Sequence, residues 1–570
     1  MLENLRTRLA GPDALPQLAA LGLATGLLAG GVIMVFRMLI ESAQGTFLPG
    51  GGTEDYEALS AGLRFLIPTL GGLFIGLLFH FAGGVQVGVV HVLERLAYNQ
   101  GHLPLRNALF QFIGAALSIV SGHSVGREGP GIHLGAASGS LLGQGLHLPN
   151  NNMQILVASG AAASIAASFN TPLAGVIFAM EVILMEYTIA GFTPVILAAV
   201  SATALNRLVF GPEPAFSVPT MQLGSLLELP YLLVMGVVIG ALAAAFISLL
   251  QRVTVWGRDI PLWWRMTLAG AFTGLCALVV PEVMGIGYDT VNHAMLGQLG
   301  LGLLAAIVLF KLVATATALG LGLPGGLIGP TLVIGASAGG VLGLLATGFF
   351  PGQVASPGFY AMLGASAMMG ATLQAPLAAL MALLELTTNT NLILPGMLAV
   401  IFSGITSSHL FGRGPVFMTL LRSRGLDYRS DPVAQSLRRV GVAGVYSTAF
   451  VRAPREIDRT AAQELLEHAP LWVLVEQDGR PISLLLAADL ARLLAAEAEG
   501  EAEETPIDLM AIPGQREDVA PIDYRATLQQ ALEVMNEKNI NALYVTASLR
   551  ARRGGIAGII TRQNVESHYH

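Results

Sequence analysis

The chain has 570 residues, of which 53% are hydrophobic, only 12% are charged and 68 are glycine, and its mean hydropathy is +0.65. An average soluble domain carries about 25% charged residues, so this composition excludes a single large soluble enzyme, a disordered chain and a coiled coil. It predicts a polytopic membrane protein in which small residues let helices pack closely. The net charge of −7 leaves no basic surface for phosphates, which argues against a nucleic-acid partner.

The charge deficit is confined to one part of the chain. Apolar runs separated by short polar breaks continue to residue 421, and ordinary charge density returns from about residue 436. We therefore expect an N-terminal segment (1–17), a membrane domain (18–424), a linker (425–445) and a soluble domain (446–570).

Arginines flank the membrane domain at both ends. Arg6 and Arg8 precede it, and Arg422, Arg424 and Arg429 follow it. Because basic residues favour the cytoplasmic side, both termini are predicted to be cytoplasmic, with an even number of crossings. We expect a multi-pass protein of the cell (inner) membrane, with membrane lipid as a partner.

The apolar runs differ in length. Segments 18–41, 229–251 and 299–322 are long enough to cross about 30 Å of hydrocarbon as helices. Four other runs are shorter and are interrupted by glycine and proline: 127–146, 172–187, 325–347 and 374–388. Short, interrupted runs that recur in two halves indicate broken helices around a binding site near mid-membrane.

The recurrence is visible in the residues themselves. Residues 129–143 (GPGIHLGAASGSLLG) and 329–343 (GPTLVIGASAGGVLG) share the pattern GP-x4-GA-x2-G-x2-LG at an offset of 200. Residues 160–181 and 364–385 match again at an offset of 204. An internal repeat is predicted, with halves at about 18–212 and 225–424. The pattern leaves open whether the halves run parallel or inverted.

The soluble tail also repeats. Residues 458–494 predict a helix, a strand, a tight Asp-Gly turn, a second strand and a helix. Residues 523–566 repeat this order with a longer loop between the strands, and an acidic linker separates the two copies.

The most informative motif is GREGP at 126–130. It places Glu128 at the predicted start of a helix with Pro130 in the first turn, and a helix start carries free amides and partial positive charge that suit an anion. A carboxylate in an apolar membrane segment is a functional candidate, and the structural alternative is a salt bridge with Arg127. The related start GGLIGP at 325–330 carries no charge, so its amides suit an anion or close packing.

Two histidines flank this motif. His123 and His133 lie five residues before and after Glu128. Histidine titrates near neutral pH, so these side chains are candidate pH sensors, and the alternative is ordinary buried histidines. The chain has a single cysteine and no HExxH sequence, so no metal site is expected.

The chain resembles the chloride channel/transporter (CLC) family. The resemblance rests on GREGP at 126–130, GGLIGP at 325–330, FNTPLAGVIFAME at 169–181 and LFGRGPVFMTLL at 410–421, and it covers nearly the whole membrane domain. The tail resembles paired CBS domains, at about 446–496 and 506–568. The resemblance implies an all-α membrane domain with an inverted repeat and broken helices, a C-terminal α/β CBS pair, and a homodimer.

The resemblance also implies roles for residues around Glu128. The ionised carboxylate of Glu128 would act as a gate that occupies an anion site and leaves on protonation or displacement by an anion. The amides of Leu327 and Ile328 would line the central site, and those of Arg127 and Gly129 would lie above it.

Three positions depart from the family pattern. The family motif GSGIP falls on QVGVV at 86–90, which puts Val87 and Gly88 at the anion and replaces a serine hydroxyl by valine. Phe417 stands where the family has a tyrosine, so a second hydroxyl donor is absent. Each lost donor removes about 1–3 kcal/mol of anion binding. Val182 takes the place of an inner glutamate that passes protons to the gate, which favours passive conduction over proton exchange.

CBS pairs often bind adenine nucleotides through a hydroxyl and an aspartate. The first repeat offers Asp489 without the hydroxyl, and the second offers Thr561 and Asn564 without the acid. A structural, dimer-forming tail is therefore expected, with nucleotide binding as the alternative and no other cofactor.

We predict a homodimeric CLC-type anion channel, not an enzyme, that conducts chloride or another small inorganic anion with Glu128 as its gate. An alternative within the family is an anion/proton exchanger with an atypical proton path, or a conductor of bicarbonate or nitrate. Outside the family, the alternatives are a CBS-regulated sensor without transport and a carrier of the magnesium or sulfate type.

Overall fold

The computed structural model describes residues 9, 14–49, 52–213, 216, 222–350, 354–426, 432–498, 506–546 and 555–568. Most of the predicted N-terminal segment (1–17) and part of the predicted linker lie outside these residues. The chain forms two compact units. The membrane unit comprises residues 18–145 and 153–428, and the tail comprises residues 1–17, 146–152 and 429–570.

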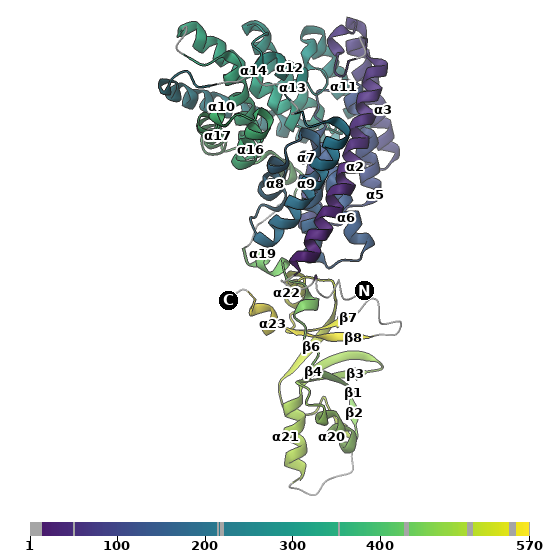
Figure 1. Ribbon diagram of the computed structural model, residues 1–570. Coiled ribbons are helices and arrows are strands. Elements are labelled where there is room, and N and C mark those ends of the chain that lie inside the picture. Colours follow the sequence, from purple (N-terminus) through teal and green to yellow (C-terminus); the bar gives the residue numbers. More distant parts are fainter. Residues whose placement is uncertain are drawn as a thin grey trace. The chain divides into compact units, whose positions relative to one another are not determined.

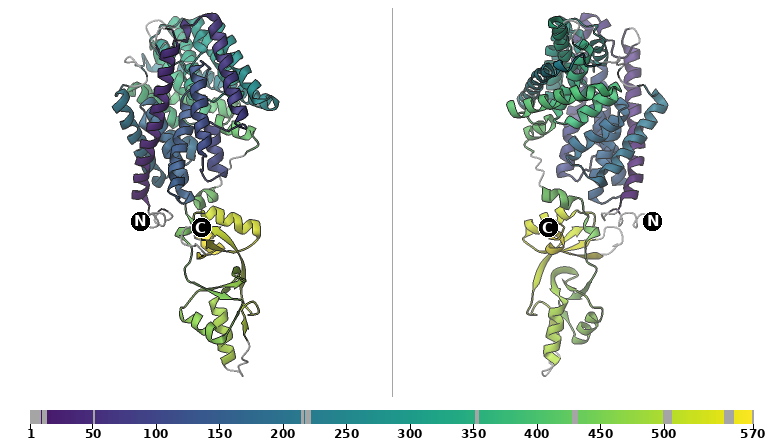
Figure 2. Two further views of the ribbon diagram at one scale, coloured as in Figure 1. Left: turned by 90° about the vertical axis from the view of Figure 1, so that its right-hand side faces the viewer. Right: turned by 60° about the vertical axis from the view of Figure 1, so that its left-hand side comes forward.

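The membrane unit is helical, and nine helices in the described part of the chain are long and apolar enough to cross a membrane. In Figures 1 and 2 its first helix, α2, runs along the edge of this unit. The helices of the first half are α2 (Leu15–Phe47), α3 (Ala61–Phe81), α4 (Val89–Tyr98), α5 (Leu105–Val120), α6 (Glu128–Gly145), α7 (Asn150–Phe169), α8 (Pro172–Phe178) and α9 (Ile189–Phe210).

The second half repeats this order of long and short helices. Its helices are α10 (Leu229–Trp256), α11 (Leu262–Val279), α12 (Tyr288–Met295), α13 (Leu301–Gly320), α14 (Ile328–Phe349), α15 (Pro357–Leu373), α16 (Pro376–Thr387) and α17 (Ile393–Ile405). The unit ends with α18 (Val416–Ser423), and α19 (Pro432–Arg438) follows in the tail. The start of α6 at Glu128 and the start of α14 at Ile328 reproduce the sequence offset of 200.

The central helices are those richest in small residues. Helices α6 and α14 are buried along most of their length, whereas α2 exposes large apolar side chains such as Leu27, Leu28 and Val35, as a helix facing lipid does. Their glycines let the neighbouring helices α7 and α15 cross at backbone contact. The two motif-bearing helix starts are thereby placed in the interior of the unit.

Two reciprocal contacts show how the halves are related. Gly126 and Gly326 exchange both backbone hydrogen bonds, each at 2.7 Å, as an antiparallel bridge. The carboxylate of Glu181 accepts hydrogen bonds from the first amides of α16, and the equivalent Glu385 accepts them from the first amides of α8. Equivalent residues that contact each other in this mutual way are related by a two-fold axis.

The tail contains one six-stranded sheet in the order β1-β3-β4-β6-β7-β8. Each repeat supplies a parallel pair, a hairpin and two helices, and the antiparallel pairing of β4 with β6 joins the repeats. The first repeat contains β1 (Phe450–Pro454), β2 (Glu456–Ile457), α20 (Arg459–Glu467), β3 (Trp472–Gln477), β4 (Arg480–Leu486) and α21 (Ala487–Ala498). The second contains β5 (Ile507–Asp508), which pairs with β2, then β6 (Arg516–Asp523), α22 (Leu528–Lys538), β7 (Ala542–Thr546), β8 (Ile556–Thr561) and α23 (Arg562–Glu566).

Candidate functional site

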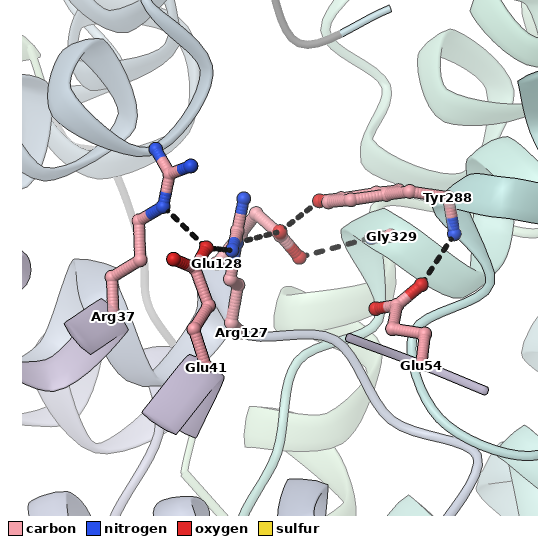
Figure 3. A network of polar contacts seen from close by, with 7 residues as sticks. All are labelled: Arg37, Glu41, Glu54, Arg127, Glu128, Tyr288 and Gly329. Carbon is pink, nitrogen blue, oxygen red and sulfur yellow. Dashed lines mark hydrogen bonds and ion pairs between the residues drawn. The ribbon is translucent and has the colours of Figure 1, made fainter. Parts of the chain in front are cut away.

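The side chain of Glu128 lies buried between the two repeat halves, with an exposed fraction of 1% for the residue. Its Oε2 atom accepts a hydrogen bond from the backbone amide of Gly329, at 3.2 Å, in the first turn of α14. Its Oε1 atom accepts a hydrogen bond from the hydroxyl of Tyr288 (Figure 3). The carboxylate therefore occupies the amide-lined helix start of the opposite half, which is the kind of place where an anion binds.

Arg127 connects Glu128 to a second carboxylate. The Arg127 guanidinium lies 3.9 Å from Glu128 and 3.4 Å from Glu41, and Arg37 binds the same Glu41 carboxylate at 2.6 Å (Figure 3). The salt bridge considered as the structural alternative for Glu128 is therefore present but long. Because Arg127 is shared between two carboxylates, its positive charge is not devoted to Glu128 alone.

A cavity of about 650 Å³ reaches the glycine-rich helix starts from one side. Of the predicted anion-binding residues, the structure brings five together on its wall: Val87, Gly88, Gly129, Leu327 and Phe417. Valine and phenylalanine replace the two hydroxyl donors in this wall, as the sequence predicts. The polar partners that remain on this wall for an anion are backbone groups and side chains such as Gln111, whose buried amide has no hydrogen-bond partner among the described residues.

We call this space the arginine cavity because Arg258, Arg265 and Arg424 line it. One acid, Glu94, also lines it, and its carboxylate lies 3.7 Å from Arg424. The excess of positive charge attracts anions and repels cations. This end of the path therefore suits an anion better than a cation.

A second cavity, of about 480 Å³, has the opposite character. We call it the acidic cavity because its wall contains five carboxylates: Glu54, Asp55, Glu57, Glu282 and Asp289. Burial, helped by the negative charge of Asp289, raises the pKa of Glu54 to about 7, and the same two causes raise the pKa of Glu57 to about 7. These two carboxyls therefore change charge near neutral pH.

The two cavities open at opposite faces of the membrane unit. Residues just before α3, such as Glu54, line the acidic cavity, and residues just after α3, such as Gln86, line the arginine cavity. Helix α3 is long enough to cross the membrane, so the cavities lie at its two ends. The equivalent helices α4 and α12 contribute to different cavities, which makes the repeat inverted rather than parallel.

The remaining predicted positions lie around this path. Ile328 is buried at the first position of α14 and contributes no atom to either cavity wall. Val182 is buried in a π-helical turn, Ala179–Leu184, that continues α8. The neighbouring Glu181 caps α16, so its carboxylate points away from the gate, as expected from the sequence.

The two flanking histidines are fully buried. The Nδ1 atom of His123 lies 2.9 Å from the carbonyl oxygen of Ser118. The Nε2 atom of His133 lies 2.9 Å from Nδ1 of His91, whose neighbour Val90 lines the arginine cavity. Neither histidine is placed against Glu128 in the described contacts, so their proposed pH sensing stays a prediction.

Sequence reasoning missed four residues that shape the site: Glu54, Tyr288, Lys311 and Gly329. Tyr288 and Glu54 lie outside every repeated motif. Only the fold brings Tyr288 to Glu128 and Glu54 to the amide of Tyr288. Lys311 had a usable signal, because it is one of two lysines in the chain and stands inside an apolar helix. Gly329 belongs to the motif GGLIGP, but the family resemblance assigns the anion to the two preceding amides, those of Leu327 and Ile328.

The tail residues proposed for a nucleotide are occupied by local contacts. Asp489 accepts a hydrogen bond from the amide of Gln515 at 3.1 Å and pairs with Arg492 at 2.9 Å. The Thr561 hydroxyl and the Asn564 side chain cap α23 reciprocally. These contacts engage the groups that a ribose would need, and nucleotide binding at these residues stays a prediction.

A family model described as voltage gated chloride channel matches residues 71–408. The chain belongs to this family. A CBS domain model matches residues 512–569, and the first tail repeat has the same order of elements. The CLC chain is thus a multi-pass anion-transport protein with a C-terminal CBS pair, which confirms the predicted family and fold class.

Relatives of this CLC protein carry two kinds of name. It is 33% identical over 389 residues to a ClcB-like chloride channel protein of Ralstonia nicotianae, covering 66% of this chain and 90% of that relative. It is 31% identical over 320 residues to the H(+)/Cl(-) exchange transporter ClcA of Vibrio cholerae serotype O1, covering 55% and 68% of the two chains. Among solved structures, it is similar to a slow cyanobacterial Cl-/H+ antiporter with a TM-score of 0.62 and 25% identity, over 73% and 98%.

Proposed function

We propose that this protein transports chloride through a path between the arginine cavity and the acidic cavity, with Glu128 as its gate. The observation that carries the proposal is the hydrogen bond that the Glu128 carboxylate accepts from the amide of Gly329 at the start of α14. An anion at that place would use the same amide and the same partial positive charge. The carboxylate and the transported anion are therefore competitors for one site.

The surrounding charges support an anion path. Arginines line one cavity, and the wall next to the gate carries the backbone of Gly129 and Leu327. With valine and phenylalanine in place of two hydroxyl donors, the central region binds an anion more weakly than a hydroxyl-lined site would. Chloride is the anion named for the relatives, and we propose it here, with bicarbonate and nitrate as comparison anions.

Replacing Glu128 tests the gate. Glu128→Gln removes the charge that competes with chloride, so chloride flux through purified protein in liposomes should rise severalfold and lose most of its pH dependence. Glu41→Gln is the matched control, because Glu41 also contacts Arg127 but lies outside the anion position. Unchanged flux, pH response and anion selectivity in Glu128→Gln would contradict the gate.

One observation supports passive anion conduction, and one supports exchange of the anion for protons. Val182 at the inner position supports passive conduction, which we take as the first candidate, because valine passes no proton. The exchange transporter and antiporter among the relatives support proton exchange as the second candidate. Stoichiometric proton movement driven by a chloride gradient selects exchange, and its absence selects conduction.

The acidic cavity predicts a pH response on one face. As the pH on that face rises through about 7, Glu54 and Glu57 ionise, and negative charge accumulates beside the gate. The other charged groups that act on these two carboxyls are Asp289, Glu282, Arg127 and Lys311. Chloride flux from that face is therefore expected to fall severalfold between about pH 6 and about pH 8, one unit either side of that value.

The Glu54→Gln/Glu57→Gln double variant should keep the flux high across this range. Flux measured with the pH varied on one side of the liposome at a time checks this, and the arginine-cavity side serves as the control. A wild-type response of equal size from both sides, or an unchanged response in the double variant, would contradict the assignment.

We further propose a homodimer in the inner membrane with both termini in the cytoplasm, so that the arginine cavity opens to the cytoplasm. Support comes from the family resemblance and from the arginines at both ends of the membrane domain. The CBS pair is assigned a structural role, because its candidate ribose ligands are engaged locally. Chemical crosslinking in native membranes tests the dimer.

A further inference from the structure

Tyr288 contacts Glu128 through its side chain, and the next residue, Asp289, lines the acidic cavity. It is the first residue of α12, and its hydroxyl donates to Oε1 of Glu128 while the amide of Gly329 donates to Oε2 (Figure 3). One hydroxyl and one backbone amide thus hold the two oxygens of the gate. Both donors come from the second half of the chain, and the carboxylate comes from the first.

The Tyr288 ring is held by contacts that do not involve Glu128. Phe216 packs edge-on at 5.4 Å between ring centres, and Phe169 packs at 5.9 Å. The guanidinium of Arg127 lies 5.4 Å from the ring centre. The backbone amide of Tyr288 donates to Glu54 at 3.0 Å. The hydroxyl therefore keeps its position when the carboxylate moves.

A fixed donor has a consequence for the open gate. When the Glu128 carboxylate leaves, the Tyr288 hydroxyl and the Gly329 amide both point at the space that it vacates. Leaving a half-buried hydroxyl without a partner costs free energy, and a small anion in the vacated space removes that cost. Preorganised donors of this kind bind an anion with little reorganisation.

We propose that Tyr288 is an anion-binding residue of this protein, and that its hydroxyl donates to Glu128 in the closed gate and to the transported chloride in the open gate. The proposal rests on the proposed function of Glu128. It supplies a side-chain hydroxyl to a path in which Val87 and Phe417 provide none. In the family pattern the hydroxyl donors stand at the positions of Val87 and Phe417, in the arginine cavity. In this protein the proposed hydroxyl donor, Tyr288, lies on the other side of Glu128.

The test measures chloride binding with the competing carboxylate removed. In an otherwise wild-type chain, Tyr288→Phe weakens both competitors for the same donor, so the two effects partly cancel. In Glu128→Ala the site is free, and chloride affinity can be measured by calorimetry on the purified full-length protein. Adding Tyr288→Phe to Glu128→Ala should weaken chloride binding about tenfold, as expected for one hydrogen bond to a charged partner.

Tyr231→Phe in the same Glu128→Ala background is the matched control. The Tyr231 hydroxyl donates to the carbonyl of Leu342 at 2.7 Å, so its loss should leave chloride affinity unchanged. Bromide soaked into crystals of Glu128→Ala gives a second measurement, with an anomalous peak expected between the Tyr288 hydroxyl and the Gly329 amide. The peak should be lost when Tyr288→Phe is added.

The outcomes separate the two proposals. Equal chloride affinity with and without Tyr288→Phe, or an unchanged bromide peak, would overturn the role of Tyr288 and leave the gate intact. An unchanged flux and pH response in Glu128→Gln would overturn the gate itself. A tenfold loss confined to the Tyr288 variant would establish the residue as a ligand of the anion.

Discussion

Replacing Lys311 by methionine is expected to lower the free energy of unfolding of the membrane unit by about 3 kcal/mol or more. The Lys311 ammonium is fully buried, and it donates to three successive carbonyls, those of Val283 at 2.9 Å, Met284 at 3.4 Å and Gly285 at 3.0 Å. Methionine has a similar length and no donor. The carbonyls would then be buried without a partner, at about 1–3 kcal/mol each.

The same substitution should also weaken transport. The segment that Lys311 holds leads directly through Gly287 into Tyr288, and a φ of +87° at Gly287 makes this turn dependent on glycine. Loss of the ammonium also removes a positive charge that acts on Glu54, Glu57 and Asp289. We expect the pKa of both glutamates to rise, so the pH response from the acidic-cavity face should move to higher pH.

Lys538→Met is the natural control, because Lys538 is exposed on α22 in the tail and is the other lysine of the chain. Its replacement should change the free energy of unfolding by no more than about 0.5 kcal/mol. Thermal melting of both variants in one detergent compares them, and chloride flux with the pH varied on each face measures the second effect. A Lys311→Met protein with the wild-type melting temperature and pH response would contradict both roles of the lysine.

The two-fold organisation could be predicted from the sequence because both halves keep the same small residues in the same order. The GP motifs of the two halves are 200 residues apart. Gly126 and Gly326 are separated by the same distance in sequence, and they exchange backbone hydrogen bonds. The direction of the repeat could not be obtained this way, since a shared pattern is the same for parallel and inverted halves. It followed only from the placement of equivalent helices at opposite cavities.

The candidate site was predicted in part for a similar reason. Glu128 stands out because a carboxylate is rare in an apolar helix, and Val87 and Phe417 stand out against the family motifs. Tyr288 lies 160 positions from Glu128, and nothing in its neighbouring residues marks it as a partner. Its role depends on packing between the halves, which no local pattern encodes.

Substituting Gly364 by alanine is expected to prevent correct folding of the membrane unit. A Cβ atom at this position of α15 would lie 2.2 Å from the carbonyl oxygen of Gly335 on α14. The equivalent crossing in the first half is equally tight, with 1.9 Å between a Cβ at Gly160 and the carbonyl oxygen of Gly135. Both obstructing atoms belong to backbone, so the helices themselves must separate, at a cost of about 3 kcal/mol or more.

Gly404→Ala on α17 is the control, because a Cβ there meets nothing within 4 Å. Alanine should leave that helix as stable or stabilise it by about 0.5–1 kcal/mol. Size-exclusion profiles and melting temperatures of both variants compare the positions. If Gly364→Ala gives a monodisperse protein with the wild-type melting temperature, close crossing of α14 and α15 is not required. Loss of folding in Gly364→Ala and its retention in Gly404→Ala would show that small residues are required where α14 and α15 cross. The membrane unit has few charged side chains, so an anion path through it depends on backbone donors. Close packing of small residues is what places those donors.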